Sequence, residues 1–466
     1  METKVTRQTW LAILATGMIT FLGMMLQTGL TIALPSLMQI FRVDADMSQL
    51  INSLYDMMVT ILIIMSPFLV KRFKTPVLFF SSIVLFLIGI AISALTTSFG
   101  ILLFGRLVQG IAVGITIPLM FNIILTKVPR QKMGMMIGVG TLMITLGPAV
   151  GSFYGSLVLQ LANWPFLFWI VGGLVLVSLL MGMRTITPLQ ATQKVQLDWL
   201  GLLEVILVFG GYTFGFSFLS SQTISPVLIW GSLGLALIFT MAFIYHCNHS
   251  DEPLLRLTMF KQADFRRLLV AFFISQIVAV AIEFILSMYL QSAAEFSAVA
   301  TSLVIFPGAL LAAVVSPFGG ILLDRHGAKR VLYTGSALYT VGLILFVVTD
   351  NLMGAIMATL FYMAVMLGLG IVTGDLQTSG LGTLDGSDRT DGNALFNAAQ
   401  QFAGTIGLTL IGTIFTAFQA GKKGLAFVAG TRQGSLWSFV FLTVLTLIAD
   451  YGLWLTFRHS QQNTSK

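Results

Sequence analysis

Long, unbroken apolar runs constrain this chain more than any other feature of its sequence. Fourteen such runs, each about 20 residues long, follow one another between residues 10 and 457. A run of this length crosses the hydrocarbon layer of a bilayer as an α-helix, whereas the strands of a membrane β-barrel alternate polar and apolar residues. We therefore expect an all-α polytopic membrane protein with fourteen transmembrane helices.

Composition excludes the soluble classes. Hydrophobic residues make up 56% of the 466 positions and charged residues only 9%, whereas soluble domains carry about 25% charged residues. This composition cannot supply a water-facing surface for the whole chain. The net charge of +7 comes from bases scattered singly through short loops, so it indicates membrane orientation and not a nucleic-acid partner.

Two polar breaks divide the runs into three expected parts. They are an amino-terminal six-helix bundle (1–184), a linker with two inserted helices (185–250) and a carboxy-terminal six-helix bundle (251–466). The expected spans are 10–35, 47–70, 77–97, 99–124, 134–160, 165–184, 198–220, 225–246, 266–290, 297–323, 331–349, 351–377, 393–418 and 434–457.

The distribution of Lys and Arg predicts the orientation of these spans. With both termini inside, 20 of the 25 bases lie in cytoplasmic segments, as expected from the excess of Lys and Arg in cytoplasmic loops. Three bases between the last two spans do not follow this trend, namely Lys422, Lys423 and Arg432. We expect a multi-pass protein of the bacterial cytoplasmic membrane with both termini in the cytoplasm.

A short basic turn between the tenth and eleventh spans is the second informative feature. In it, Asp324 can accept hydrogen bonds from a neighbouring helix end, and Arg325 and Arg330 can pair with it. Gly320 and Gly327 allow close helix approach and a tight reversal. This turn, residues 320–332, aligns without gaps to residues 66–78, which indicates an internal repeat.

The earlier copy of the turn is degraded. Val70 stands where the acid should be, and Phe73 stands where the second glycine should be. We therefore expect the electrostatic contact that the acid of this turn makes with its neighbours to be weak or absent in the amino-terminal half.

Ionisable side chains inside the expected spans are the candidate functional groups, because a charge in hydrocarbon is costly and must face a cavity or a partner. Arg106 lies roughly 10 Å inside its span, and Asp56 lies at a similar depth and is its natural counter-charge. Two interpretations stay open: a structural ion pair, or a proton-exchanging Asp56 tuned by Arg106. The other acids are Glu204, Glu283, Asp375 and Asp450; Glu283 and Asp375 join Asp56 as proton or substrate candidates.

The fifth span carries a stripe of small residues. Gly138, Gly147 and Gly151 remove side chains so that two helices can slide closely. Pro148 frees one backbone carbonyl and bends the helix. We interpret this stripe as part of a moving helix contact.

Three of these patterns resemble motifs of the major facilitator superfamily. The turn at residues 320–332 fits the signature spacing G-x-x-x-D-R-x-G-x-x-R, Arg106 with Gln109 and Gly110 fits R-x-x-Q-G, and the fifth span fits the antiporter motif G-x8-G-P-x-x-G. The resemblance implies the major facilitator fold, in which two six-helix bundles rock about a site near the midplane and expose it to each side in turn.

Further segments look like the fourteen-span branch of drug:proton antiporters, namely Asn163–Phe166, Asp198–Gly201 and Asp391–Asn397. That branch usually carries an acid in span 1, upstream of an Ala-Leu-Pro. Here residues 33–35 are Ala-Leu-Pro, but Leu26 stands at the acid's position, next to Gln27. A proton site in span 1 is therefore missing.

Enzyme chemistry finds little support in the sequence. The four histidines lie in or beside expected loops and form no metal set with the single cysteine, Cys247. No P-loop is present, so ATP is not the expected energy source. We expect no catalytic residues, no cofactor and no metal, with the proton gradient as the source of energy.

The leading hypothesis is proton-coupled efflux of amphipathic, cationic or zwitterionic drug-like compounds by alternating access. Its partners would be small-molecule substrates, protons and membrane lipid, with no nucleic acid, and the protein would act as a monomer. Two alternatives stay open. One is a dedicated exporter of one metabolite or lipid-like compound, and the other is a membrane sensor that does not transport.

Overall fold

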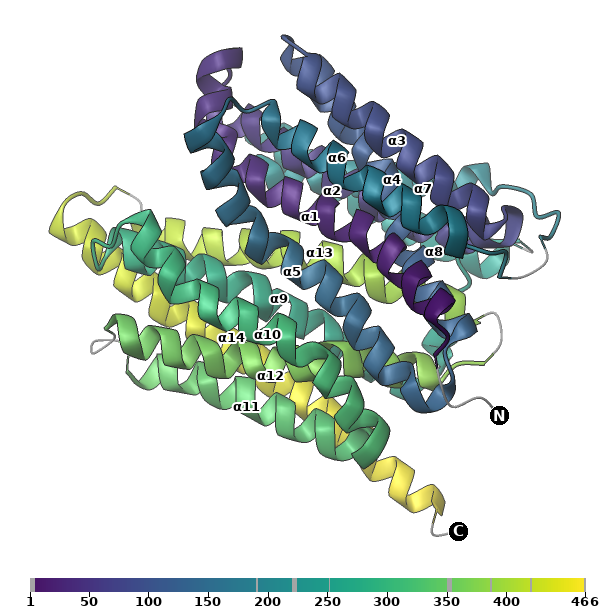
Figure 1. The fold of residues 1–466 in the computed structure, drawn as a ribbon. Helices are drawn as coiled ribbons and strands as arrows, with labels where there is room; N and C mark the ends of the chain where they lie inside the picture. The colour runs from purple at the N-terminus through teal and green to yellow at the C-terminus, as the bar shows by residue number, and fades with distance from the viewer. Residues whose placement is uncertain are drawn as a thin grey trace. The chain divides into compact units, whose positions relative to one another are not determined.

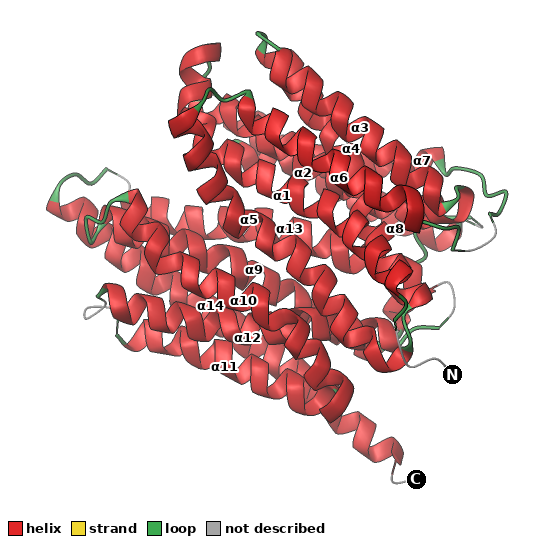
Figure 2. Cartoon of the chain, in the orientation of Figure 1, coloured by secondary structure: helices red, strands yellow, loops and turns green. Residues whose placement is uncertain are grey.

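The computed structural model describes residues 5–189, 192–219, 224–250, 252–349, 354–385, 388–419 and 421–464. Throughout these residues the regular structure is helical, with loops between the helices (Figure 2). Fourteen of the helices are long and apolar enough to cross a membrane. The expected all-α fold with fourteen spans is thus confirmed.

The long helices are α1 (Arg7–Phe41), α2 (Ala45–Arg72), α3 (Thr75–Leu95), α4 (Phe99–Lys127), α5 (Met133–Leu161), α6 (Phe166–Thr185), α7 (Trp199–Ser217), α8 (Pro226–His249), α9 (Ala263–Ser292), α10 (Ala298–His326), α11 (Ala328–Val348), α12 (Ala355–Gly382), α13 (Asp388–Gln419) and α14 (Leu425–Thr464) (Figure 1). Two short 3-10 helices, Arg130–Lys132 and Thr258–Lys261, precede α5 and α9.

Side-chain caps explain several helix starts. Thr6 accepts a hydrogen bond from the Thr9 backbone N–H at the start of α1, and Ser297 accepts one from Ala300 at the start of α10. Asp198 accepts one from Gly201 at the start of α7. Each of these short polar side chains satisfies a backbone donor that has no partner within its own helix.

Two helix starts lie farthest from the expected spans. α13 begins at Asp388 and not at residue 393, and α14 begins at Leu425 and not at residue 434. Hydropathy misses the first turn of α13 because it is polar, and it misses the start of α14 because Arg432 and Gln433 interrupt the apolar run, although both segments are helical. At the second junction the Gln419 side chain donates to the Thr431 hydroxyl at 2.8 Å, and this bond fixes the start of α14 against the end of α13.

The chain packs as two compact units. Unit 1 comprises residues 1–130, 143–258 and 386–398, and unit 2 comprises residues 131–142, 259–385 and 399–466. In unit 1, α4 packs against α1, α2 and α3, and α6 packs against α1 and α3. In unit 2, α12 packs against α9, α10 and α11, and α14 packs against α9 and α11. α5 and α13 each contribute one part to each unit.

The inserted helices α7 and α8 belong to unit 1. α7 packs on α2, where the Ser217 hydroxyl donates to the Ser53 hydroxyl at 2.8 Å. α8 packs on α7, and the rest of its surface exposes large apolar side chains such as Trp230 and Ile238. This surface suits contact with lipid tails. The expected domain boundaries after residues 184 and 250 stay a prediction.

Candidate functional site

Arg106 on α4 is buried in the middle of unit 1, with none of its surface exposed. Its Nε donates to the Ile51 carbonyl oxygen at 3.1 Å, and its Nη1 donates to Gln109 Oε1 at 2.7 Å. The guanidinium also lies over the Tyr55 ring, 4.1 Å from the centroid. Carbonyl, amide and aromatic contacts therefore surround the cation on several sides.

Asp56 on α2 is half-buried and is held by a neutral partner. Gln27 on α1 donates from Nε2 to both carboxylate oxygens, at 2.8 Å each. Asp56 and Arg106 interact electrostatically, but among the described residues no ion pair joins them. The expectation of a direct Asp56–Arg106 pair is therefore corrected: Tyr55 faces the guanidinium, and Asp56 faces α1.

These contacts define a unit 1 polar cluster, which consists of Gln27, Asp56, Arg106, Gln109 and Ser93. Gln109 Nε2 donates to the Ser93 hydroxyl at 3.0 Å and so extends the cluster to α3. One carboxylate, one cation and several neutral donors thus lie within apolar helices from α1 to α4. In such a setting a carboxylate is stabilised by a proton or by a cation, and the two exclude each other.

Glu283 on α9 is exposed on unit 2, in the middle of a membrane-length helix. It interacts electrostatically with Tyr362 on α12, which is fully buried. About two helical turns away on α9, Gln276 accepts a hydrogen bond from Gln400 Nε2 at 3.5 Å. The Glu283 side chain thus lies on the surface of unit 2.

Asp375 on α12 is 1% exposed, and its Oδ2 has no hydrogen-bond partner among the described residues. It interacts electrostatically with Asp324. The adjacent Gly374 lies against Gly138 and Thr141 of α5. The structure thus brings Asp375 and Asp324, two predicted site residues from separate helices, to the contact between α5, α10 and α12.

Asp324 binds the amino-terminal end of α5. The backbone N–H groups of Gly134 and Met135 each donate to its carboxylate at 3.3 Å. The predicted acceptor role at a neighbouring helix end is confirmed, and the charge suits the positive end of the helix dipole. Arg325 and Arg330 are exposed, and within the described chain neither forms an ion pair with Asp324, which corrects the predicted pairing. Gly327 has a φ of 78° and turns the chain into α11.

The glycine stripe of α5 faces a different helix in each unit. In unit 1, a Cβ at Gly147 would lie 2.6 Å from Met24 Cβ of α1, and one at Gly151 would lie 2.5 Å from the Met25 carbonyl oxygen. In unit 2, a Cβ at Gly138 would lie 2.5 Å from the Ser316 carbonyl oxygen of α10. Gly320 approaches Gly134 closely as well. Pro148 lies inside α5, next to Gly147.

Sequence reasoning missed a contact between a histidine and an aspartate in unit 1. His246 at the end of α8 lies 2.9 Å from Asp198, which also accepts from the Leu254 N–H at 3.1 Å. Glu204 on α7 interacts electrostatically with both residues. The sequence signal that could have indicated a role for Asp198 is its position directly before the apolar run of α7, where an aspartate caps a helix.

Two other acids inside the long helices also have partners in the structure. Asp450 on α14 accepts a hydrogen bond from Thr340 at 3.0 Å, and the nearby Arg458 lies over the Trp454 ring. Asp391 on α13 is buried and interacts electrostatically with Lys71 and Arg256. The earlier copy of the basic turn has Val70 where the acid should be. Asp391 of α13 interacts instead with Lys71, the residue that follows Val70.

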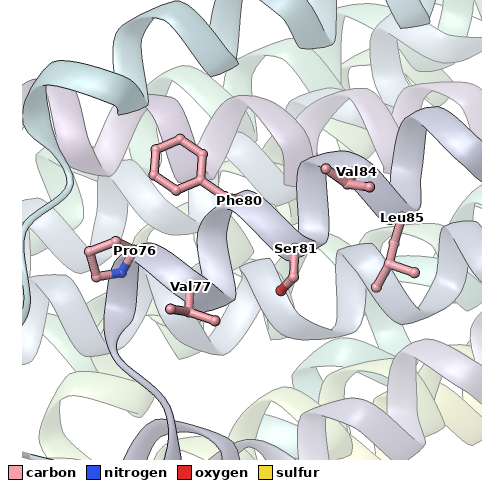
Figure 3. Close-up of a pocket in the computed structure, with 6 residues that line it drawn as sticks. All are labelled: Pro76, Val77, Phe80, Ser81, Val84 and Leu85. Atoms are coloured by element: carbon pink, nitrogen blue, oxygen red, sulfur yellow. The ribbon is translucent and has the colours of Figure 1, made fainter.

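A hollow of about 620 Å³ lies on the surface of α3 (Figure 3). Only α3 lines it, through Pro76, Val77, Phe80, Ser81, Val84 and Leu85. With apolar walls and no ionisable side chain, it suits a lipid tail and is separate from the unit 1 polar cluster. Among the described residues, no group of His, Cys, Asp and Glu could hold a metal ion.

Comparison with known proteins agrees with this architecture. A sequence model of the Major Facilitator Superfamily matches residues 16–408. The lincomycin resistance protein LmrB of Bacillus subtilis (strain 168) is 33% identical over 86% of this chain and 84% of its own length. The LmrB protein of Listeria monocytogenes is 30% identical over 89% and 88%. The putative multidrug resistance protein MdtD of Escherichia coli is 24% identical over 90% and 88%.

Solved structures show the same fold at low sequence identity. The human organic anion transporter MFSD10 (TETRAN) superposes with a TM-score of 0.68 at 14% identity, covering 96% of this chain and 99% of its own. The proton:xylose symporter XylE superposes with a TM-score of 0.68 at 13% identity, covering 97% and 96%. The chain therefore belongs to the major facilitator superfamily, whose members are membrane transporters and not enzymes.

Proposed function

We propose that this protein exports amphipathic, cationic drug-like compounds across the bacterial cytoplasmic membrane in exchange for protons. It acts as a monomer with both termini in the cytoplasm and works by alternating access. The observation that carries the proposal is Asp56: a half-buried carboxylate inside a membrane-spanning helix, held by a neutral amide and influenced by a buried cation.

Proton and substrate compete for this carboxylate. A proton neutralises Asp56, and a cationic substrate stabilises its charge, so binding of one excludes the other. Arg106 adds a fixed positive charge and thereby favours loss of the proton. This exchange is the minimum chemistry that an antiporter needs, and Glu283 and Asp375 provide further carboxylates in unit 2.

The relatives support drug-like substrates. Two of them are named for lincomycin resistance and one for multidrug resistance. Lincomycin is therefore the first probe, and a cationic dye is the second. The glycine contacts of α5 with α1 and with α10 support alternating access, because close backbone contacts without side chains permit sliding.

A dedicated exporter of one compound is the second candidate. The observation that favours it is Gln27, a neutral side chain beside the position where the multidrug branch usually carries an acid. With one carboxylate fewer in α1, the protein would couple fewer protons and bind fewer kinds of cation.

Transport into everted membrane vesicles tests these proposals. A proton gradient should drive uptake of lincomycin and of the dye, and collapse of the gradient by an ionophore should stop it. Asp56→Asn should abolish uptake, and Glu283→Gln and Asp375→Asn should reduce it at least about tenfold, as expected when a charged ligand is lost.

Asp264→Asn is the matched control, because Asp264 is an acid at the start of α9 that pairs only with the nearby Arg267 among the described residues. It should transport normally. Normal transport by Asp56→Asn and Glu283→Gln together would rule out the proposed site, and uptake of one compound only would favour the dedicated exporter. Binding without gradient-driven uptake would indicate a sensor.

A further inference from the structure

Leu26 and Gln27 of α1 are neighbours in sequence but have different surroundings. Leu26 is fully buried and belongs to the apolar packing of α1. Gln27 is half-buried and points its side-chain amide at Asp56 of α2, where Nε2 lies 2.8 Å from each carboxylate oxygen. The polar contribution of α1 to the unit 1 polar cluster is therefore made by an amide one residue further along the helix.

The surroundings of Asp56 contain few other groups that could determine its protonation. α2 packs against α1, α3, α4 and α7. α3 carries no ionisable residue, and α1 carries only Arg7, at its start. α4 presents Arg106, which interacts with Asp56 without a hydrogen bond, as does the neighbouring Tyr55. On α7, Glu204 interacts with His246 and Asp198 instead, and Tyr212 stacks on Phe216.

We propose that Gln27 is the positioning residue for Asp56, and that its amide holds the carboxylate in the ionised, cation-accepting form and thereby sets the pH at which Asp56 takes up a proton. The proposal rests on the proposed proton exchange at Asp56 and deepens it. Hydrogen bonds from a neutral donor stabilise the charged form of a carboxylate more than the protonated form.

An amide suits both states of the carboxyl group. Its N–H groups donate to the ionised carboxylate, as in this structure, and after rotation its carbonyl oxygen can accept from the protonated form. It takes up no proton itself. Gln27 thus contacts Asp56 from α1 without adding a titratable group, and the unit 1 polar cluster keeps one exchangeable carboxyl.

The test measures protonation of Asp56 directly, independently of transport. Dicyclohexylcarbodiimide reacts with the protonated carboxyl, and mass spectrometry of the purified full chain gives the fraction of Asp56 modified at each pH. In the Gln27→Met variant, which keeps the side-chain length, the midpoint of modification should rise by about one to two pH units, because hydrogen bonds to the charged form are lost.

Two further variants sharpen this test. Gln27→Glu places a second carboxyl beside Asp56, so the two should share a proton and the midpoint should rise further. Thr31→Val is the matched control on the same face of α1. It removes the hydrogen bond from Asn52 at 2.8 Å and the one that Thr31 donates to the Gln27 backbone carbonyl at 3.1 Å, but it leaves the Gln27 side-chain amide in place. Its midpoint should therefore equal that of the wild type.

A midpoint in Gln27→Met equal to that of the wild type would overturn the proposal, as would an equal shift in Thr31→Val. Because Gln27→Glu keeps a polar side chain at this position, it gives a second reading if Gln27→Met folds poorly. If vesicles show no proton-driven transport but the midpoint shifts as expected, the proposed function fails and the positioning role of Gln27 stands.

Discussion

At the scale of single residues, the direction of each side chain decides which groups meet. Successive residues on an α-helix point about 100° apart, so Tyr55 and its neighbour Asp56 face different helices. Tyr55 lies under Arg106 of α4, and Asp56 receives Gln27 of α1. The sequence predicts that Asp56 and Arg106 lie at a similar depth along their helices. It does not predict that the side chain of Asp56 faces α1 and not Arg106.

Arg106→Lys should lower both stability and transport. A lysine cannot donate to Ile51 and Gln109 in a planar fork and stack on Tyr55 at the same time. Each buried acceptor left without its donor costs about 1–3 kcal/mol. We expect the thermal unfolding midpoint in detergent to fall by several degrees and uptake to fall at least about tenfold.

Arg458→Lys is its control, since Arg458 also lies over an aromatic ring, Trp454, but on the exposed surface of α14. It should unfold at the wild-type temperature. An equal fall of the unfolding midpoint in the two variants would mean that the buried contacts of Arg106 add no stability beyond that of an exposed arginine over a ring.

Two substitutions of Tyr55 distinguish the contribution of its ring to stability from that of its hydroxyl. Its hydroxyl has no hydrogen-bond partner among the described residues, whereas its ring contacts the Arg106 guanidinium. Tyr55→Phe should therefore keep stability, and Tyr55→Leu should lose about 2 kcal/mol or more of cation–π attraction and packing. Chemical denaturation of the purified protein measures both. A large loss in Tyr55→Phe would contradict the structure.

At the scale of elements, hydropathy predicts the fourteen helices because each span meets the membrane separately. It fails at the starts of α13 and α14, where polar residues interrupt the apolar pattern but the helix continues. It also cannot give helix contacts. That Asp324 binds the amino-terminal end of α5 follows from packing between segments 190 residues apart, whereas the acceptor role of the acid was readable from its place in the basic turn.

The α5–α10 contact gives an element-scale prediction. Gly320 and Gly134 approach so closely that any side chain at Gly320 would collide with the α5 backbone. Gly320→Val should therefore break this contact, lower the thermal unfolding midpoint and abolish uptake. Gly452→Val is the matched control, because a Cβ at Gly452 in α14 meets nothing within 4 Å. Wild-type behaviour of Gly320→Val would mean that the contact is dispensable.

At the scale of the whole molecule, the segment that follows the inserted helices depends on polar contacts of one residue, Asp198. The inserted helices end where residues 252–258 lead the chain from α8 towards α9. Asp198 holds this linker: it accepts from the Leu254 N–H and contacts His246 while it caps α7. Hydropathy predicts α7 and α8 as spans and the internal repeat indicates that they are an inserted pair, but only the folded chain shows that Asp198 and His246 at their polar ends contact each other and the linker.

Asp198→Ala should release this linker without unfolding the helices. It removes the acceptor for Leu254 and Gly201 and the partner of His246, so the segment around Arg256 should open more often. Cleavage by trypsin after the exposed Arg256 measures that opening, because proteolysis follows the population of locally open states. We expect a rate increase of about fivefold or more, which corresponds to about 1 kcal/mol. Cleavage after Arg325 and Arg330 in the same molecule is the internal control and should not change. If both regions were cleaved faster together, the variant would be unfolding globally, and the linker would not depend on Asp198 in particular.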